Sequence, residues 1–400
     1  MEDVVRRIAR FNQTRLPDIV QRKYAAMSVD AFRFFRGSAH LFYEDLHKES
    51  LFQKQPSTWL CGDLHLENFG SYKGDNKLVY FDVNDFDEAV LGPFTWDVAR
   101  MVTSILIGGK VLRISGDGIR KMAGIYLDIY FQYLRNGKSK HVEAETAKGT
   151  LKQFLEKVEL RKMKVLLAQR CELKRSVLKI DNEKQLRLQD DSKKKLVAAL
   201  AQWIGQSKDK RYQYDLKDVA FRIAGTGSLG LKRYVFLGEN IQGKSVLIDM
   251  KECVPPSAVK WIRQAQPEWK SEAERVVWVQ RMMQDTPPAM LTEYKFGDDW
   301  YLLKMLQPTD DKLNYQHLAN DVQSLEQLMK DTGMLTASAH LRMTGRKGAD
   351  TADALMEAAA DEGMKKEIMK LATDYSKKTF AYFQQFADAF QAGYFNQKEQ

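Results

Sequence analysis

The stretch that organises this chain is CGDLHLENFG, Cys61 to Gly70, followed closely by VYFDVNDFDEA, Val79 to Ala89. Asp63 and Asn68 stand five residues apart in the first segment, and glycines bound that segment as they commonly bound loops. The second segment begins as an apolar run typical of a buried strand. It ends in a cluster of carboxylates: Asp82, Asp85 and Asp87. The two segments predict a loop and a strand that together supply several carboxylates and one amide.

These residue types at this spacing are typical of phosphoryl transfer. Kinases place an Asp beside the acceptor hydroxyl, an Asn five residues later against Mg²⁺, and another Asp from a later strand between metal and phosphates. Asp63 is therefore the expected base, and Asn68 an expected Mg²⁺ ligand. A solvated hairpin turn is the alternative interpretation. It has no need for Leu64, Leu66 and Phe69, which alternate with polar residues and would anchor the loop.

Length and composition indicate a protein that can bury a large core. A chain of 400 residues with 44% hydrophobic content suggests two or three domains or one bilobal protein. No membrane span is expected, because the best apolar run, which starts at Met101, is broken by glycines and charges. The first residues show no secretory signal, and isolated cysteines fit a reducing compartment, so we expect a cytoplasmic protein. The cysteines form no zinc pattern: Cys61, Cys171 and Cys253.

The formal net charge of +9 is concentrated in one segment. Between Lys148 and Lys195, fifteen Lys or Arg stand against seven Asp or Glu. Such an excess can attract nucleic acid or another acidic partner, but a solvated helix face accounts for it as well. Aromatic residues are not interleaved with the basic ones, so the stacking platforms that bind single-stranded nucleic acid are missing. Nucleic acid is therefore not an expected partner.

Two patterns of periodicity divide the chain. From Met1 to Leu51, and again from Thr95 to about Trp203, apolar residues recur at helical spacing. At Tyr212 the character changes to β-branched and aromatic residues interrupted by glycine turns, which predicts a sheet built from hairpins. Helical spacing returns at Leu313. The sequence therefore predicts a helical part, a sheet, and further helices.

The first turn of the predicted sheet is GTGSLG, which contains Gly225, Gly227 and Gly230 in a G-x-G-x-x-G pattern. A dinucleotide-binding loop would open a helix, whereas the residues after this turn alternate with strand periodicity. A glycine loop between two strands is the kinase form, in which the backbone, here with Ser228, folds over a triphosphate. The next strand, VLIDMKE, ends in Lys251, the expected phosphate-binding lysine.

The remainder of the sheet segment also follows a kinase pattern. SEAERVVWVQRMMQ predicts a helix that Ser271 and Glu274 cap, and two further strands lead to LQP at 306–308. That tripeptide is the expected hinge between two lobes. Met305 and Leu306 beside the hinge complete the predicted nucleotide site.

The kinase parts stand in an unusual order, with the catalytic loop before the glycine loop. A circular permutation explains this, because joining the end near Gln400 to Met1 restores the usual order. The expected fold is α+β: a bilobal, protein-kinase-like, circularly permuted fold with a small antiparallel β lobe and a larger helical lobe. The expected domains are a helical lobe with the catalytic loop and metal-binding strand over 1–211, the nucleotide lobe over 212–306, and completing helices over 307–400.

Several long motifs, in order, resemble the bacterial proteins grouped as domain of unknown function 2252: FFRGSAHLFYEDL, CGDLHLENFG, FDVNDFDEAVLGPFTWDVARM, AGTGSLG, MKE, RVVWVQRMMQ and ASAHLRMTG. CGDLHLEN and NDFDEA are also similar to the loop and metal segment of aminoglycoside and choline phosphotransferases. That resemblance implies that Asp63 is the base and that Asn68 and Asp85 bind metal. It further implies a loop-supporting role for Asp97, with Asp82 as the fallback ligand.

Two departures from these patterns bear on activity. Cys61 stands where the phosphotransferases carry a His two residues before the Asp, so the loop must be braced differently. Trp278 stands where the family pattern has an acidic residue. If that acid normally pairs with the lysine, Lys251 relies on Glu274 or on no partner.

The expected function is ATP- and Mg²⁺-dependent transfer of phosphate to a hydroxyl of a small-molecule or protein acceptor that the sequence does not identify. A nucleotide-binding pseudokinase that acts as an interaction module is the main alternative. A metallophosphoesterase is suggested only by the GDLH string, since the other histidines lack supporting motifs. A nucleic-acid-binding protein rests only on the basic segment. Phosphoryl and nucleotidyl transfer remain equally open.

Overall fold

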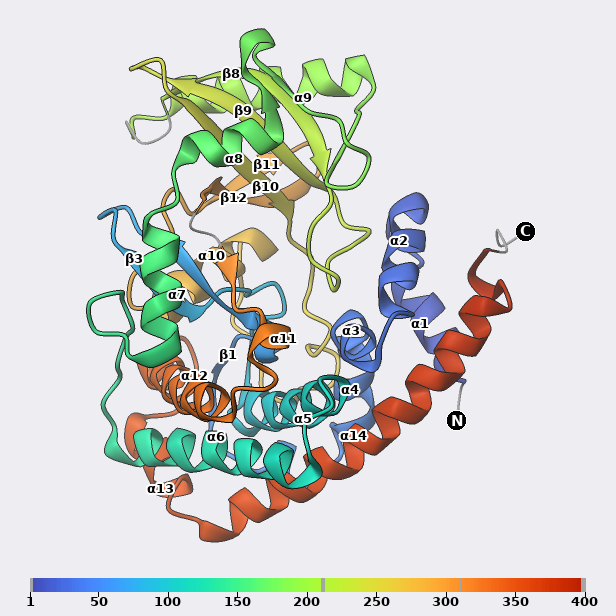
Figure 1. The fold of residues 1–400 in the computed structure, drawn as a ribbon, viewed down its shortest axis with the longest axis vertical. Coiled ribbons are helices and arrows are strands. Elements are labelled where there is room, and N and C mark those ends of the chain that lie inside the picture. The colour runs from blue at the N-terminus through green and yellow to red at the C-terminus, as the bar shows by residue number, and fades with distance from the viewer. Residues whose placement is uncertain (1–2, 210–212, 309–310, 397–400) are drawn as a thin grey trace.

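The structure is a computed structural model that describes residues 3–209, 213–308 and 311–396 (Figure 1). The helices are α1 Val4–Asn12, α2 Pro17–Met27, α3 Ala31–Gly37, α4 Ala39–Leu46, α5 Thr95–Val111, α6 Gly116–Asn136, α7 Gly149–Glu159, α8 Met163–Arg170, α9 Asp190–Gln206, α10 Glu272–Met283, α11 Tyr315–Leu318, α12 Val322–Met343, α13 Ala352–Ala358 and α14 Glu362–Gln391. The strands are β1 Ser57–Leu60, β2 Phe69–Lys73, β3 Val79–Val83, β4 Val90–Pro93, β5 Cys171–Glu172, β6 Val177–Leu178, β7 Gln185–Leu186, β8 Tyr214–Arg222, β9 Arg233–Asn240, β10 Ser245–Glu252, β11 Thr292–Phe296, β12 Asp299–Leu306 and β13 Asp311–Lys312. The expected α+β class is confirmed.

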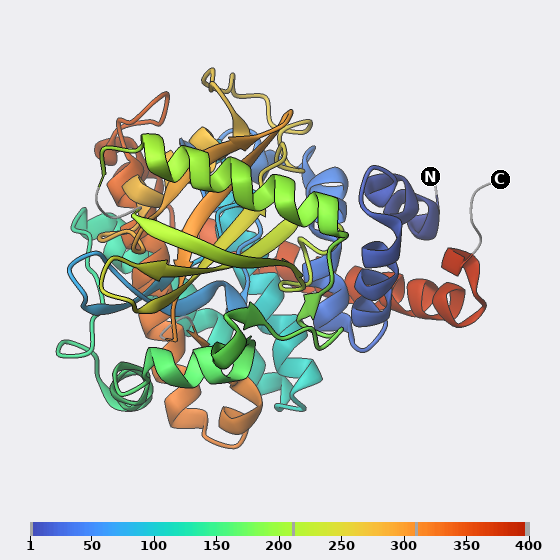
Figure 2. The same cartoon turned by 90° about the horizontal axis from the view of Figure 1, so that it is seen from above.

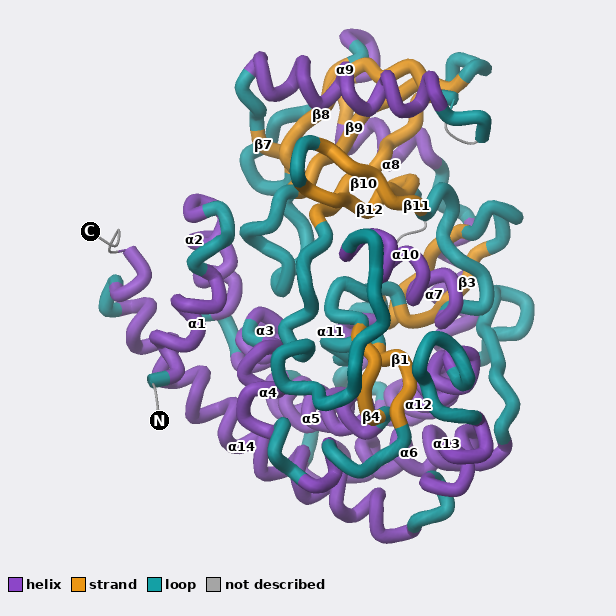
Figure 3. Tube along the Cα trace, turned by 180° about the vertical axis from the view of Figure 1, so that it is seen from behind, coloured by secondary structure: helices purple, strands orange, loops and turns teal. Residues whose placement is uncertain are grey.

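The largest sheet is antiparallel and has the strand order β11-β12-β10-β9-β8-β7 (Figure 3). The glycine loop joins β8 to β9, as the strand periodicity predicted, and Lys251 lies on β10. Helix α10 follows β10 along the chain, and Ser271 accepts a hydrogen bond from the Glu274 N–H at its start. Smaller antiparallel sheets, β13-β2-β3 and β1-β4, hold the loop of Asp63.

Two helices from the basic segment cover the large sheet. Leu200 of α9 packs with Phe236 on one face, while Leu167 of α8 packs with Val235 on the other. Successive strand residues point to opposite faces, so neighbours in β9 serve different helices. Figure 2 shows α9 lying across the sheet. Helical periodicity does not specify the layer against which a helix packs, so these two helices were expected in the helical part.

The other layer of the molecule is helical and centres on α5. Every residue from Thr95 to Gly109 of this helix is buried, which is typical of a helix in the middle of a core. Helices α6 and α14 pack against α5, and α12 packs against α6 (Figure 1). Because α5 carries both Asp97 and Arg100, two charged side chains enter the core beside the loop of Asp63.

The two ends of the described chain lie together. Val5 and Ile8 of α1 share a core cluster with Phe386 of α14 and with Phe395 (Figure 1).

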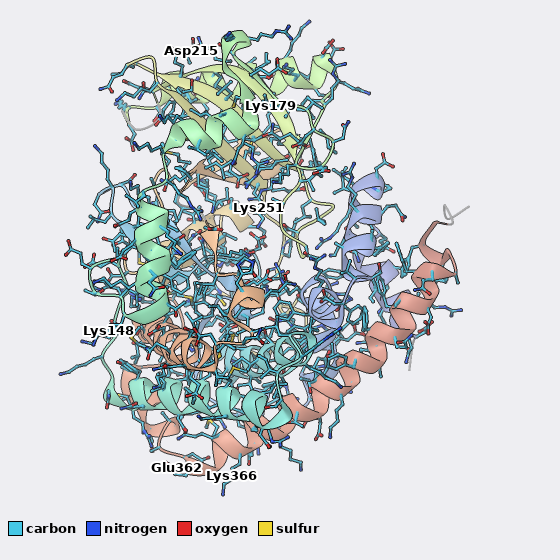
Figure 4. The ribbon with its side chains drawn as sticks, in the orientation of Figure 1. Lys148, Lys179, Asp215, Lys251, Glu362 and Lys366 are labelled. Carbon is cyan, nitrogen blue, oxygen red and sulfur yellow. The ribbon has the colours of Figure 1, made fainter. Side chains whose placement is uncertain are left out.

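The basic segment is spread over both layers, with Lys148 beside α7 and Lys179 near α8 (Figure 4). Within the described ranges, no helix is both long and apolar enough to cross a membrane.

Candidate functional site

The loop that carries Asp63 and Asn68 runs from β1 to β2 and contains a short 3-10 helix, Leu66–Asn68. The predicted anchors Leu64 and Phe69 are almost fully buried. Asn68 Nδ2 donates a hydrogen bond to the Asp63 carbonyl oxygen at 2.6 Å. Among the described residues, Asn68 Oδ1 receives no hydrogen bond, so this oxygen remains available to a cation.

Gly62 brings the loop into contact with the acidic segment, Asp85 to Glu88, which follows β3. Its φ of +90° lies in a region that favours glycine. A Cβ at this position would lie 2.1 Å from the Glu88 carbonyl oxygen, which no side chain could tolerate. The start of the loop and the carboxylates after β3 are therefore held in direct contact.

Asp97 braces the same loop from below, as the phosphotransferase resemblance implied. Its carboxylate accepts hydrogen bonds from the backbone N–H groups of Cys61 at 2.8 Å and Gly62 at 3.2 Å. His340 Nε2 lies 3.3 Å from Asp97 Oδ2, and Tyr130 Oη lies 2.8 Å from the other ring nitrogen. The brace therefore reaches from α5 to α6 and α12 and does not need a histidine at position 61.

Removing this brace should weaken the fold. Asp97→Ala leaves two buried N–H groups without acceptors, and each such group costs about 1–3 kcal/mol. We expect the free energy of unfolding, measured in urea, to fall by about 2–6 kcal/mol. Asp97→Asn keeps one acceptor oxygen and should lose less stability. If the free energy of unfolding of Asp97→Ala equals that of the wild type, Asp97 does not support the loop.

Arg100 holds the carboxylate of Asp63. Its guanidinium, fully buried, donates from Nε to Asp63 Oδ1 at 2.7 Å and contacts the same oxygen through a second nitrogen. It also donates to the Phe35 carbonyl oxygen at 3.2 Å. Burial raises the pKa of Asp63 to about 7, although Arg100 opposes the shift. Asp63 is thus fixed through one oxygen and has the pKa of a base that works near neutrality.

Lys251 meets the acidic segment after β3. Its Nζ lies 3.5 Å from Asp85 Oδ1 and closer still to Asp87 Oδ2. Burial lowers the pKa of Lys251, but the two carboxylates outweigh burial and raise it. Burial would raise the pKa of Asp85, yet Lys251 and neighbouring cations hold it below its usual value. The lysine is charged, and its partners come from the segment predicted to bind metal.

Arg275, at the start of α10, binds the backbone of the acidic segment. It is buried and donates to the carbonyl oxygens of Asp87 at 3.0 Å and Val254 at 3.1 Å, and also to that of Ala89. Helix α10 therefore supports the acidic segment through an arginine. Trp278 of the same helix packs edge-to-face on Trp59 and at a tilt on Trp269.

A cavity of about 40 Å³ joins these segments. Its lining comes from the N-terminal helices, the loop, the acidic segment and the glycine loop, and includes Phe11, Arg15, Arg36, Asp63, Asn68, Asp85, Asp87, Glu88, Gly227 and Ser228. A Cβ on Gly227 would lie 3.7 Å from Asp63 Oδ2, so the glycine loop closes directly over the expected base. In Figure 4, Lys251 lies at the side of the sheet that is nearer the helical layer.

The motifs that build this cavity lie within a family match. Residues 15–389 match the family described as "Uncharacterized protein conserved in bacteria (DUF2252)". The chain belongs to DUF2252. No curated protein and no solved structure matches it.

Several predicted residues of this DUF2252 protein lie outside the cavity. Asp82 is buried and faces Arg342, whose nitrogen lies 3.4 Å from Asp82 Oδ2, so the fallback ligand points away from the site. Glu274 accepts from the Lys270 N–H and does not reach Lys251, because it faces the start of its own helix. Met305 and Leu306 end β12 and pack into the two cores of the sheet.

The outer glycines of the loop shape it without lining the cavity. Gly225 and Gly230 have φ values of +78° and +97°, which other residues rarely adopt. A Cβ on Gly230 would lie 2.8 Å from Arg15 Cβ, so this glycine allows the loop to contact the N-terminal helices. Gly227 and Ser228 form the part of the loop that faces Asp63.

Metal ligands are few in the DUF2252 site. Among the described residues, no group of three or more His, Cys, Asp or Glu side chains is arranged to hold a metal ion. Mg²⁺ is commonly held by one or two carboxylates together with substrate phosphates, so Asn68 Oδ1 and Asp85 fit this mode of binding. They do not form a complete site without a phosphate ligand.

Sequence reasoning did not predict the arginines of the site or the role of Phe11. Arg100 follows Asp97 by three residues, which places both on one face of α5 and was a readable signal. Phe11 lies on α1, Arg15 lies in the turn between α1 and α2, and Arg36 lies on α3 within the family motif FFRGSAHLFYEDL. Their positions depend on how the N-terminal helices dock on the rest of the fold.

Proposed function

We propose that this protein is an ATP- and Mg²⁺-dependent phosphotransferase with a circularly permuted, kinase-like arrangement. The observation that carries the proposal is the meeting of Asp63, Asn68, Asp85 and Gly227 at one cavity, with Lys251 bound to Asp85. Kinases use these same types of group, in these roles, for phosphoryl transfer.

The packing of the chain ends supports the permutation. Helices α1 and α14 share a core cluster, so a chain joined there and opened elsewhere could keep the same fold. In that order, the glycine loop, Lys251, α10, the helices and the loop of Asp63 follow as in a kinase. In this arrangement, the nucleotide lobe would comprise the large sheet together with α8 and α9.

The chain offers specific groups to a nucleotide. Lys251 would exchange its carboxylate partners for phosphate oxygens, and the N–H groups of the glycine loop would lie over them. Asn68 Oδ1 and Asp85 would hold Mg²⁺, whose chemistry is to neutralise charge on the phosphates. A cavity of about 40 Å³ has room for only a few water molecules, so the glycine loop must move to admit a triphosphate.

The transfer step assigns one role to Asp63. An acceptor oxygen forms a bond to the γ phosphorus while the bond from that phosphorus to the leaving oxygen of ADP breaks. The acceptor proton passes to Asp63 Oδ2, because Oδ1 is held by Arg100. Arg100 positions the carboxylate and keeps the loop from rearranging during this step.

The rate of transfer should depend on the ionisation of Asp63. A protonated carboxyl cannot accept the acceptor proton, and the pKa of this group is raised to about 7. We therefore expect kcat/KM to fall about tenfold per pH unit below pH 7 and to level off above it. A pH–rate profile on a substrate found by labelled-ATP screening measures this. A flat profile from about two pH units below neutrality to about one unit above it would remove Asp63 as the base.

Replacing Lys251 should weaken nucleotide binding. Lys251→Met removes a charge-assisted contact worth about 1.5–3 kcal/mol, so the Kd for Mg²⁺·AMP-PNP should rise about 10- to 100-fold. Isothermal titration calorimetry measures this change. Lys232→Met is a matched control, since Lys232 is also paired with a carboxylate, but with Asp299 rather than with the acidic residues Asp85 and Asp87. Equal losses in both variants would contradict the assigned role.

A pseudokinase is the second candidate, and the closed cavity favours it. In this conformation Lys251 is satisfied by Asp85 and Asp87, and the glycine loop covers Asp63. Thermal shift with ATP, with and without Mg²⁺, tests binding. A screen of small molecules and proteins with α- and γ-labelled ATP then separates the outcomes: γ-label transfer supports the phosphotransferase, α-label transfer indicates a nucleotidyltransferase, and binding without transfer leaves the pseudokinase.

A further inference from the structure

A cluster of basic side chains surrounds Phe11 at the edge of the cavity. His40 stacks on the Phe11 ring with centroids 3.9 Å apart. The Arg15 guanidinium lies 5.2 Å from the ring centroid, and Lys23 Nζ lies 5.6 Å from it. Phe11 and Arg15 also line the cavity that contains Asp63, so the cluster borders the proposed site of transfer.

Within the described part of the chain, neither cation has a carboxylate partner. Arg15 donates to the carbonyl oxygens of Gly227 at 2.7 Å and Leu229 at 2.8 Å. Lys23, which is fully buried, donates to Asn12 Oδ1 and to the Gly227 carbonyl oxygen, both at 3.0 Å. His40 is buried, and neither of its ring nitrogens has a hydrogen-bond partner there.

This arrangement costs stability and therefore points to a ligand. Lys23 has no exposed surface and Arg15 is half-buried, yet both have only neutral oxygens as hydrogen-bond partners. Burial accordingly lowers the pKa of Lys23 well below its usual value. Other buried arginines of this chain follow a different rule: Arg100 pairs with Asp63, and Arg7 pairs with Asp45. An anion is the partner that the Arg15 and Lys23 pair lacks.

The glycine loop occupies the place beside these cations. Its Gly227 and Leu229 carbonyl oxygens face Arg15 and Lys23, and the Leu16 N–H binds the Gly230 carbonyl oxygen at 2.9 Å. Figure 1 shows the loop after β8 descending from the sheet toward α2 and α3. Movement of this loop, which a triphosphate requires, withdraws the carbonyl oxygens and frees both cations beside Asp63.

We propose that Arg15 and Lys23, with Phe11 between them and His40, bind an anionic group of the acceptor, so that the acceptor is a hydroxyl compound that carries a phosphate or carboxylate. This assignment of the acceptor class rests on the proposed phosphotransferase function. The nucleotide phosphates are the other source of the same chemistry. The acceptor is favoured because the cations meet the carbonyl oxygens of the loop, whereas a nucleotide would be held by its N–H groups and Lys251.

The test is calorimetric titration of inorganic phosphate into the full-length protein saturated with Mg²⁺·AMP-PNP. AMP-PNP fills the nucleotide phosphate positions, so phosphate reports the second subsite. We expect binding to the wild type, at least tenfold weaker binding to Arg15→Gln and to Lys23→Met, and partial rescue in Arg15→Lys. Arg22→Gln is the matched control, because Arg22 also donates to a carbonyl oxygen, that of Asn182, but lies outside the cavity.

The outcomes separate the two proposals. Nucleotide binding with no phosphate binding, or with phosphate binding unaffected by both substitutions, overturns the subsite and leaves the phosphotransferase intact. Weaker AMP-PNP binding in Arg15→Gln without any phosphate site assigns the cations to the nucleotide and also overturns the subsite. Phosphate binding that needs Arg15 and Lys23 in a protein that binds no nucleotide supports the subsite and refutes the proposed function. Near-wild-type circular dichroism and thermal midpoints verify that each variant is folded. If Arg15→Gln does not fold, Arg15→Lys provides the test.

Discussion

Asp63→Asn is expected to lower phosphate transfer about 10²- to 10⁴-fold, the usual contribution of a positioned general base. Asn has nearly the same shape but cannot accept the acceptor proton. Binding of Mg²⁺·AMP-PNP should remain within about threefold of wild type, because Asp63 contacts Arg100 and is not an assigned nucleotide or metal ligand. Single-turnover transfer of γ-label to the screened acceptor, paired with calorimetry, measures both quantities.

Asp82→Asn is the matched control for this prediction. Asp82 is another buried carboxylate paired with an arginine, but it faces Arg342 and not the cavity. Transfer by Asp82→Asn should stay close to wild type at temperatures where the variant is folded. Retained transfer in Asp63→Asn would refute the assignment of the base, and equal losses in both variants would attribute the effect to folding.

Arg100→Met is expected to give a large loss of stability. Removing one partner of a buried ion pair leaves an uncompensated charge, which costs about 3–5 kcal/mol. Arg100 is fully buried, and Asp63 is its carboxylate partner. Urea unfolding at pH 8 should show this loss. Arg100 lowers the pKa of Asp63, so in the variant this pKa lies above 7. The loss relative to wild type should therefore shrink as the pH falls from about 8 toward 7, because Asp63 becomes neutral first in the variant.

The double variant Asp63→Asn/Arg100→Met isolates the pair. Without the carboxylate, the orphaned charge disappears, so the double variant should be more stable at pH 8 than Arg100→Met alone. Additive losses would mean that the two side chains do not interact, in conflict with the contact between them.

The local parts of this fold were predictable from sequence. Strand periodicity after Gly230 predicted that the glycine loop joins two strands, and this is confirmed by β8 and β9. The alternation of Leu64 and Leu66 with polar residues predicted a loop anchored in the core, and both side chains are buried. These features depend on neighbours in the chain, so a single sequence reveals them.

Features that depend on packing between distant segments were not predictable. Helix α9 covers the sheet although its apolar spacing would suit any layer. Asp82 and Asp85 both follow an apolar run, yet only the structure reveals that Asp82 turns inward to Arg342 while Asp85 meets Lys251. The contact of Arg15 with the glycine loop joins segments with no shared motif.

The meeting of the early carboxylates with the glycine loop and Lys251 is the basis of the proposed function, and a crystal structure with Mg²⁺·AMP-PNP tests it most directly. The account predicts the triphosphate beneath a displaced glycine loop, its oxygens in contact with Lys251, and a Mg²⁺ ion ligated by Asp85 and Asn68 Oδ1. A nucleotide bound elsewhere, or a cavity still closed by Gly227 at saturating nucleotide, would contradict it.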